Sequence, residues 1–168
     1  MIEVKIQDAV LAAAAQEGMD AFVDAVVDAI DDAIGGELTA ETMSQLNADQ
    51  ITLLAYKILR DEVMEGGFVQ LIHNGYGAFI YKNPFGRAMK EWGVIGLSQL
   101  ISRSHKFYTK YHEMIEQDMT DDEFMAIFEK CPEFDDYDDE FVVSEEQFTN
   151  MVACYLDDNL DKFVTIVE

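Results

Sequence analysis

The spacing of hydrophobic and polar residues predicts helices along most of the chain. In residues 19–34, plotted at about 100° per residue, the apolar side chains share one arc, namely Phe22, Val23, Val26, Val27, Ile30, Ala33 and Ile34. Residues 3–17 predict a preceding helix closed by Gly18, and residues 94–117 predict a long one. No period-two alternation typical of strands competes with these patterns. We therefore expect an all-α protein that forms a single compact multi-helix domain over residues 1–168.

Capping signals predict where further helices begin. Asn47 followed by Gln50 predicts a capping box, and the helix behind it is expected to run from Ile51 to about Glu65. Thr120 precedes three acidic residues, which favours a helix start because negative charge complements the helix dipole there.

The C-terminal third is expected to contain both a loop and helices. Pro132 breaks the chain, and residues 133–140 are expected to be an acidic loop. Ser144 with Gln147 predicts a second capping box for a helix that ends at Leu156. Further helices are predicted over residues 68–73, from Asn83-Pro84, and over residues 160–167.

A large negative charge changes this picture. The chain carries 34 Asp and Glu against 11 Lys and Arg, a net charge of −23. Residues 1–49 have a net charge of −10, residues 50–113 of +3 and residues 114–168 of −16. We take these as an acidic N-terminal part, a near-neutral core and an acidic C-terminal part of one helical domain. Direct binding to nucleic acid or to an anionic membrane is disfavoured by repulsion, whereas a basic protein would be attracted.

Two groups of carboxylates are the candidate partner-binding residues. The first is a row on one helix face, Asp20, Asp24, Asp28 and Asp31, whose members four apart are about 6 Å apart along the axis. A basic groove built for phosphates would accept such a row, and the alternative is an ordinary solvated face. The second group lies in the expected loop: Glu133, Asp135, Asp136, Asp138, Asp139 and Glu140.

The second group has two alternatives, a calcium site and a merely solvated loop. EF-hand spacing fails, since Phe141 occupies the position of the required glycine and Gln147 that of the bidentate glutamate. No HExxH, GxSxG, Walker or Rossmann pattern occurs. We therefore predict no catalytic residue, no metal and no cofactor.

The cysteines and the absence of long apolar runs bear on location. Cys131 and Cys154 form no CxxC pair, so two buried thiols in a reducing cytoplasm are expected. No run of about 18 apolar residues predicts a membrane span, and the N-terminus lacks the pattern of a secretory signal.

The segment from Glu62 to Gly77 carries a motif of small and polar residues: Glu62, Gly66, Gly67, Phe68, Gln70, Asn74 and Gly77. Gly66 and Gly67 would let one helix end and the next begin close by, and Phe68 would anchor the turn in the core, so we interpret the motif as mainly structural.

With Val63, this motif resembles the signature of a bacterial family of domains of unknown function that contains the nineteen-kilodalton DNA-mimic protein. The resemblance extends over roughly residues 50–168. It implies a helical protein, often dimeric, whose acidic surface occupies the DNA-binding face of a transcription regulator.

The charge and the resemblance together favour one hypothesis over two others. We expect an acidic interaction module that mimics DNA and occupies the basic surface of a partner, such as a DNA-binding regulator. An immunity protein or antitoxin that neutralises a basic toxin is the alternative. An enzyme is the least supported class, because no set of nucleophile, base or metal ligands is assembled.

Overall fold

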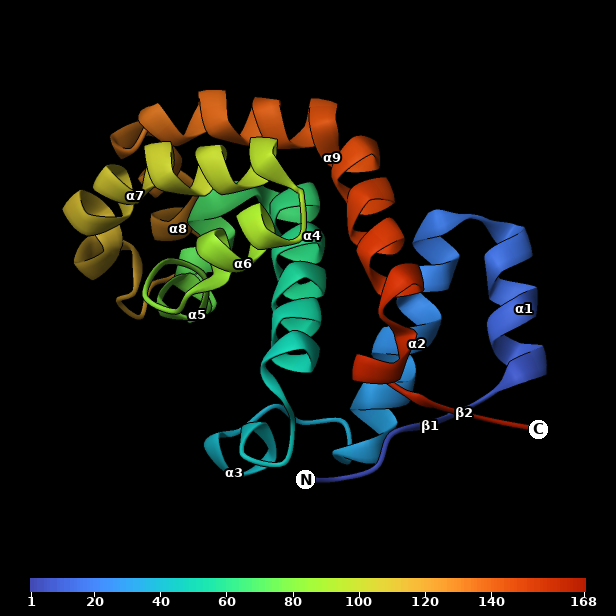
Figure 1. Ribbon diagram of the computed structural model, residues 1–168. Helices are drawn as coiled ribbons and strands as arrows, with labels where there is room; N and C mark the ends of the chain where they lie inside the picture. The colour runs from blue at the N-terminus through green and yellow to red at the C-terminus, as the bar shows by residue number, and fades with distance from the viewer. The chain divides into compact units, whose positions relative to one another are not determined.

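The computed structural model describes all residues 1–168, and helices dominate it (Figure 1). The helices are α1 (Asp8–Glu17), α2 (Met19–Ala33), α3 (Ala40–Met43), α4 (Ala48–His73), α5 (Gly77–Tyr81), α6 (Phe85–Glu91), α7 (Ile95–Ile115), α8 (Asp121–Lys130) and α9 (Glu133–Asp158). A 3₁₀ turn, Leu160–Lys162, and two three-residue strands, β1 (Lys5–Gln7) and β2 (Thr165–Val167), complete the fold. The predicted all-α class is confirmed. None of the helices combines the length and the apolar character that crossing a membrane requires.

The chain packs as two compact units. Unit 1 comprises Met1–Lys57 and Thr149–Glu168, and unit 2 comprises Ile58–Phe148. Helices α4 and α9 each contribute residues to both units. The division into residues 1–49, 50–113 and 114–168 was drawn from charge, and as a description of domain organisation it stays a prediction.

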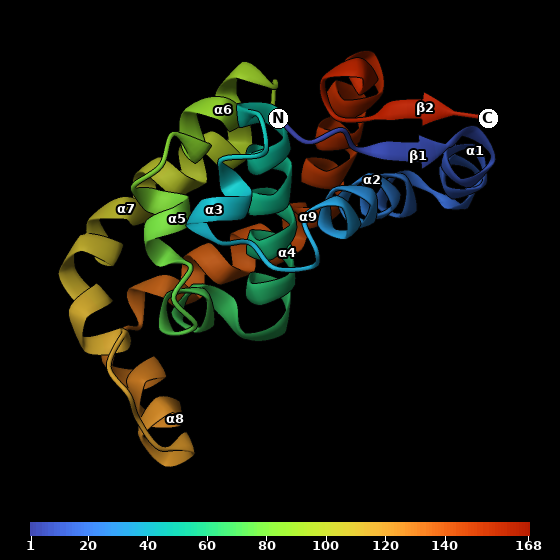
Figure 2. The same cartoon turned by 90° about the horizontal axis from the view of Figure 1, so that it is seen from below.

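In unit 1, the ends of the chain pair as a small parallel sheet. Lys5 lies opposite Thr165 and Gln7 opposite Val167 (Figure 2). The helix predicted over residues 3–17 therefore begins only at Asp8, and the helix predicted over residues 160–167 is wrong. The physical reason is pairing between residues far apart in the sequence. Val4 and Ile6, two positions apart, are both buried in the core, and the backbone N–H of Thr165 donates to the Val4 carbonyl at 2.7 Å.

The start of α4 is tied to the C-terminal segment of the same unit. The predicted capping box is confirmed, because Asn47 and Gln50 each accept a hydrogen bond from the other's backbone N–H. The Gln50 side chain is buried, and its amide also donates to the Phe163 carbonyl at 2.8 Å. Deeper in the core, the Tyr56 hydroxyl lies 2.7 Å from that of Thr149.

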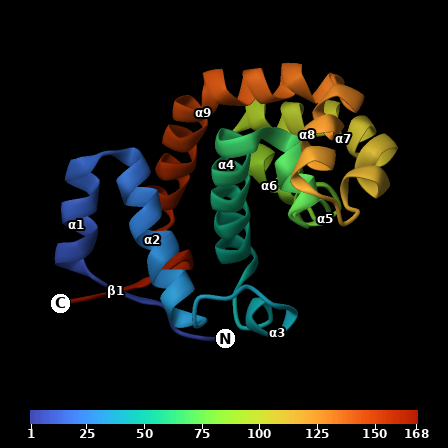
Figure 3. The same ribbon diagram turned by 180° about the vertical axis from the view of Figure 1, so that it is seen from behind.

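Unit 2 is built around α7 and residues 133–148 of α9, which run side by side (Figures 1 and 3). Phe68, Tyr81 and Phe134 fill the core beside them, with ring centroids 6.3–6.5 Å apart. Thr120 caps α8 as predicted and forms a capping box with Glu123. Pro84 is the N-cap of α6.

The acidic loop predicted over residues 133–140 is wrong, because α9 is helical from Glu133 onwards. Phe134, Phe141 and Phe148 recur every seven residues and are all buried, so one face of the helix belongs to the core. The acids of the first turn also complement the helix dipole. The predicted helix start at Ser144 falls in the middle of α9 and is likewise wrong.

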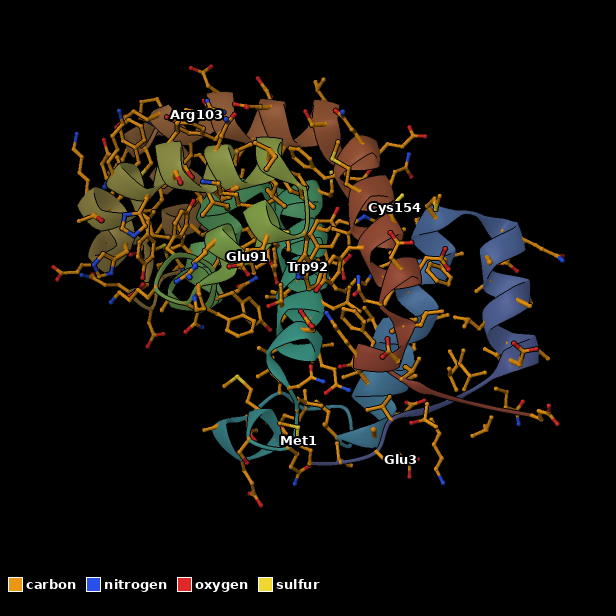
Figure 4. All side chains as sticks on the ribbon, in the orientation of Figure 1. Met1, Glu3, Glu91, Trp92, Arg103 and Cys154 are labelled. Carbon is orange, nitrogen blue, oxygen red and sulfur yellow. The ribbon has the colours of Figure 1, made fainter.

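The two cysteines are free thiols in different surroundings. Cys131 is buried, and burial raises its pKa to about 11. Cys154 is exposed on α9 (Figure 4), so the prediction of two buried thiols is wrong for this residue. Its neighbours Val152 and Ala153 take the buried positions of this turn instead.

Candidate acidic interaction faces

One side of α9 in unit 2 is exposed and free of basic residues. On a helical wheel of about 100° per residue, the exposed residues of this side span an arc of about 140°. We call this surface the acidic α9 face, and it consists of Asp135, Asp136, Asp139, Val142, Val143, Glu146 and Gln147, all exposed. Its four carboxylates have no intramolecular ion pair, so they are available to an outside cation.

The other predicted acids of this segment bind within unit 2. Glu133 accepts a hydrogen bond from the Tyr111 hydroxyl, which lowers the pKa of its carboxyl. Glu140 forms an ion pair with Arg103, which Figure 4 labels on α7. These carboxylates hold α9 against α7. They are already paired, unlike those of the acidic α9 face.

Asp138 has an internal role of a different kind. Its carboxylate accepts a hydrogen bond from the backbone N–H of Phe68 at 2.8 Å. That N–H opens the second part of α4, after the non-helical Gly67, so Asp138 acts as an N-cap supplied from another helix. Burial, together with the charges of Asp135 and Asp139, raises the pKa of Asp138 to about 7.

The predicted row on α2 belongs to unit 1 and is less uniform. Asp20 and Asp28 are exposed. Asp24 lies 3.2 Å from the Lys57 amine in an ion pair. Burial, together with the charges of Asp28 and Asp32, raises the pKa of Asp31. Two of the four carboxylates, Asp20 and Asp28, are therefore exposed to solvent without an ion pair.

A third acidic group, at the start of α8, was not among the predicted site residues. Asp121, Asp122 and Glu123 are exposed in the first turn, and Asp118 precedes them. The sequence signalled this group only as a helix start. Since the helix dipole offsets part of their charge, these acids attract a cation less than Asp139 and Glu146, which lie beyond the first turn of α9.

No group of three or more His, Cys, Asp or Glu side chains is arranged to hold a metal ion. Two of the histidines make hydrogen-bonding contacts within unit 2. Nδ1 of His73 lies 2.8 Å from the Ile115 carbonyl, and Nδ1 of His112 lies 3.3 Å from the Glu116 carboxylate.

The polar residues of the motif form a small network in unit 2. Glu62 Oε2 accepts hydrogen bonds from the side-chain amides of Gln70 at 2.8 Å and Asn74 at 2.9 Å. This network bridges the break in α4 at Gly67.

The small residues of the motif leave room for neighbouring side chains. A Cβ at Gly66 would overlap Gln70, one at Gly67 would overlap Asp138, and one at Gly77 would overlap the Tyr108 ring. Phe68 is fully buried. Each motif residue therefore has a packing or hydrogen-bonding role.

Two comparisons relate this chain to known proteins. A family model described as DMP19-like protein matches residues 44–162. The DNA mimic protein DMP19 of Neisseria meningitidis serogroup B (strain ATCC BAA-335 / MC58) is 30% identical over 128 residues, 75% of this chain and 77% of that protein. The family match contains the motif and the acidic α9 face, whereas α2 lies outside it.

Proposed function

The chain belongs to the DMP19-like protein family, and we propose that it is a DNA mimic whose acidic α9 face occupies the basic nucleic-acid-binding surface of a partner protein. The observation that carries the proposal is the exposure of four carboxylates on one side of α9, without a basic residue among them, inside the matched segment. A DNA-binding transcription regulator in the cytoplasm is the partner class we infer.

The proposed mechanism is competition for cations. A DNA-binding groove holds Lys and Arg side chains at positions that suit phosphates. Residues 135–146 of α9 extend over about 16 Å, at about 1.5 Å per residue. DNA presents phosphates about every 3.4 Å along each strand, so this length corresponds to roughly five of them. Carboxylates held along it would neutralise the groove and exclude DNA, with an affinity that falls as salt rises.

Affinity capture tests the proposal. The immobilised chain is exposed to the native cell extract at low salt, and the retained proteins are eluted with salt and identified. We expect to recover a basic DNA-binding protein, and we expect added DNA to compete with the immobilised chain and release that protein from the column. Changing Asp135, Asp136 and Asp139 together to Asn should reduce its retention and the salt dependence of binding.

A matched variant controls for net charge. Asp20, Asp28 and Asp32 are three exposed acids on α2, outside the family match, and their change to Asn removes the same charge. Equal retention by the α9 variant and the wild type would refute the proposed face. Recovery of a basic toxin nuclease in place of a regulator would assign the chain to the immunity class.

A further inference from the structure

The acidic α9 face contains two apolar side chains that packing does not explain. Val143 is 86% exposed and Val142 is 48% exposed. Both lie within one turn of Asp139 and Glu146, the carboxylates at the centre of the face. The apolar core of the same helix is supplied by the phenylalanines on its opposite side.

Helix formation does not explain these valines either. β-branched residues lose rotamer freedom in a helix and are weaker helix formers than Ala, Glu or Lys. In the monomer Val143 gains little compensating burial, and Val142 gains only about half of what a core position offers. Two adjacent valines are therefore weak choices for helix formation alone, and a partner that covers them would add the apolar burial that the monomer does not supply.

The charge around the valines selects the kind of partner. A second copy of the chain docked on the same face would bring four carboxylates against four others, which opposes that contact. A cationic surface would complement the carboxylates, but charge complementarity alone does not explain why two apolar side chains lie among them. DNA-binding surfaces combine both features, since Lys and Arg contact phosphates while apolar side chains contact the thymine methyl group.

We propose that Val142 and Val143 are the specificity-determining contacts of the acidic α9 face, taking the place of thymine methyl groups against an apolar side chain on the partner. This rests on the proposed function and adds to it. The carboxylates attract basic proteins in general, and the valines select those whose DNA-binding surface has an apolar side chain among its cations.

Changing both valines to threonine tests this inference. Threonine keeps the β-branched shape but puts a hydroxyl where a methyl was. The probes are the purified DNA-binding protein recovered by the capture experiment and a lysine 20-mer, a polycation without apolar reading groups. For the recovered protein we expect Kd to rise roughly tenfold or more, with an unchanged dependence on salt. For the lysine 20-mer we expect no change.

Val10→Thr is the matched control. Val10 is 49% exposed on α1, close to the exposure of Val142, and it lies outside the family match. It should bind both probes like the wild type, and circular dichroism should show that every variant keeps its helical content.

Several results would overturn the inference. One is an unchanged Kd for the recovered protein, and another is an equal loss of binding to the lysine 20-mer. A third is concentration-dependent self-association of the wild type that the valine variant loses in sedimentation, because it would assign the valines to a second copy of the chain. A capture that recovers no basic DNA-binding protein removes the proposed function and this inference together. A successful capture with unchanged binding by the valine variant removes this inference alone.

Discussion

Asp138 shows how one carboxylate of an acidic segment can serve the fold instead of a partner. Its neighbours Asp135 and Asp139 face solvent, while Asp138 caps the second part of α4 through the Phe68 N–H. A buried carboxylate with only one strong donor is costly to ionise, which agrees with its pKa of about 7.

This raised pKa predicts a pH dependence of stability. Between about pH 4 and pH 7 the folded protein keeps a proton on Asp138 that the unfolded chain has lost, so the unfolding free energy falls as pH rises through this window. Above pH 7 the loss is complete, with a ceiling of about 4 kcal/mol. Asp138→Asn cannot ionise and its amide oxygen can still accept from Phe68. It should therefore be more stable than the wild type at pH 8 by about 1–3 kcal/mol, with little difference at pH 4.

Urea unfolding at pH 4, 6 and 8 measures this effect. Asp139→Asn removes the same charge from an exposed neighbour and serves as the control. If Asp138→Asn and Asp139→Asn have parallel stability profiles, burial of Asp138 has no influence on its ionisation.

At the scale of helices, the break in α4 determines where the Asp138 cap can act. Gly67 has φ +78° and ψ −177°, a conformation that is essentially restricted to glycine. In addition, a Cβ at this position would overlap the Asp138 carboxylate. The break therefore depends both on the backbone conformation and on the close approach of α9.

Two glycine substitutions compare this break with a positive-φ glycine that has no close neighbour. Gly75 also has a positive φ, +91°, but a Cβ there would meet nothing within 4 Å. Gly75→Ala should cost about 1–2 kcal/mol for the backbone alone. Gly67→Ala should cost about 3 kcal/mol or more, because its φ/ψ combination is essentially restricted to glycine and the cap is displaced as well. Chemical denaturation measures both. Equal costs for the two variants would show that the Asp138 contact adds nothing to the break.

The same helices show which features the sequence makes accessible. The apolar arc of α2, the capping box at Asn47, the helix start at Thr120 and the interruption at Gly67 follow from local patterns, and the structure contains all of them. The helical state of residues 133–140 does not follow from charge density, which favoured a loop. The seven-residue spacing of Phe134, Phe141 and Phe148 would have indicated the helix.

The roles of individual acids were less predictable, because their partners are distant in sequence. Asp138 bonds to Phe68, 70 positions away, and Glu140 pairs with Arg103, 37 positions away. The pairing of β1 with β2 joins the two ends of the chain in the same way. Such contacts depend on tertiary packing, and no local pattern encodes them.

At the scale of the whole molecule, charge is high in both units. Unit 1 has a net charge of −12, from 15 acidic and 3 basic residues, and unit 2 has a net charge of −11, from 19 acidic and 8 basic residues. The basic residues of unit 2 are concentrated before residue 113. Residues 113–146 contain 15 acidic residues and only Lys130 as a base. Repulsion within the folded state is therefore large, and ion pairs such as Asp24–Lys57 and Glu140–Arg103 relieve only part of it.

This excess charge predicts opposite responses of folding and binding to salt. The Debye length falls from about 30 Å at 0.01 M to about 3 Å at 1 M ionic strength, so salt screens repulsion among the protein's own carboxylates. The Tm should therefore rise by several degrees between about 0.02 M and 0.5 M sodium chloride, measured by calorimetry. Over the same range the affinity for the basic partner should fall, because the same carboxylates are then screened from its cations.

The α9 variant with Asp135, Asp136 and Asp139 changed to Asn should show a smaller change in both quantities. Chloride is the appropriate anion, since sulfate stabilises proteins by exclusion from their surface as well. A Tm that does not change with chloride would mean that the carboxylates are too dispersed to repel one another, and a face of such dispersed charges would not displace DNA from a basic groove.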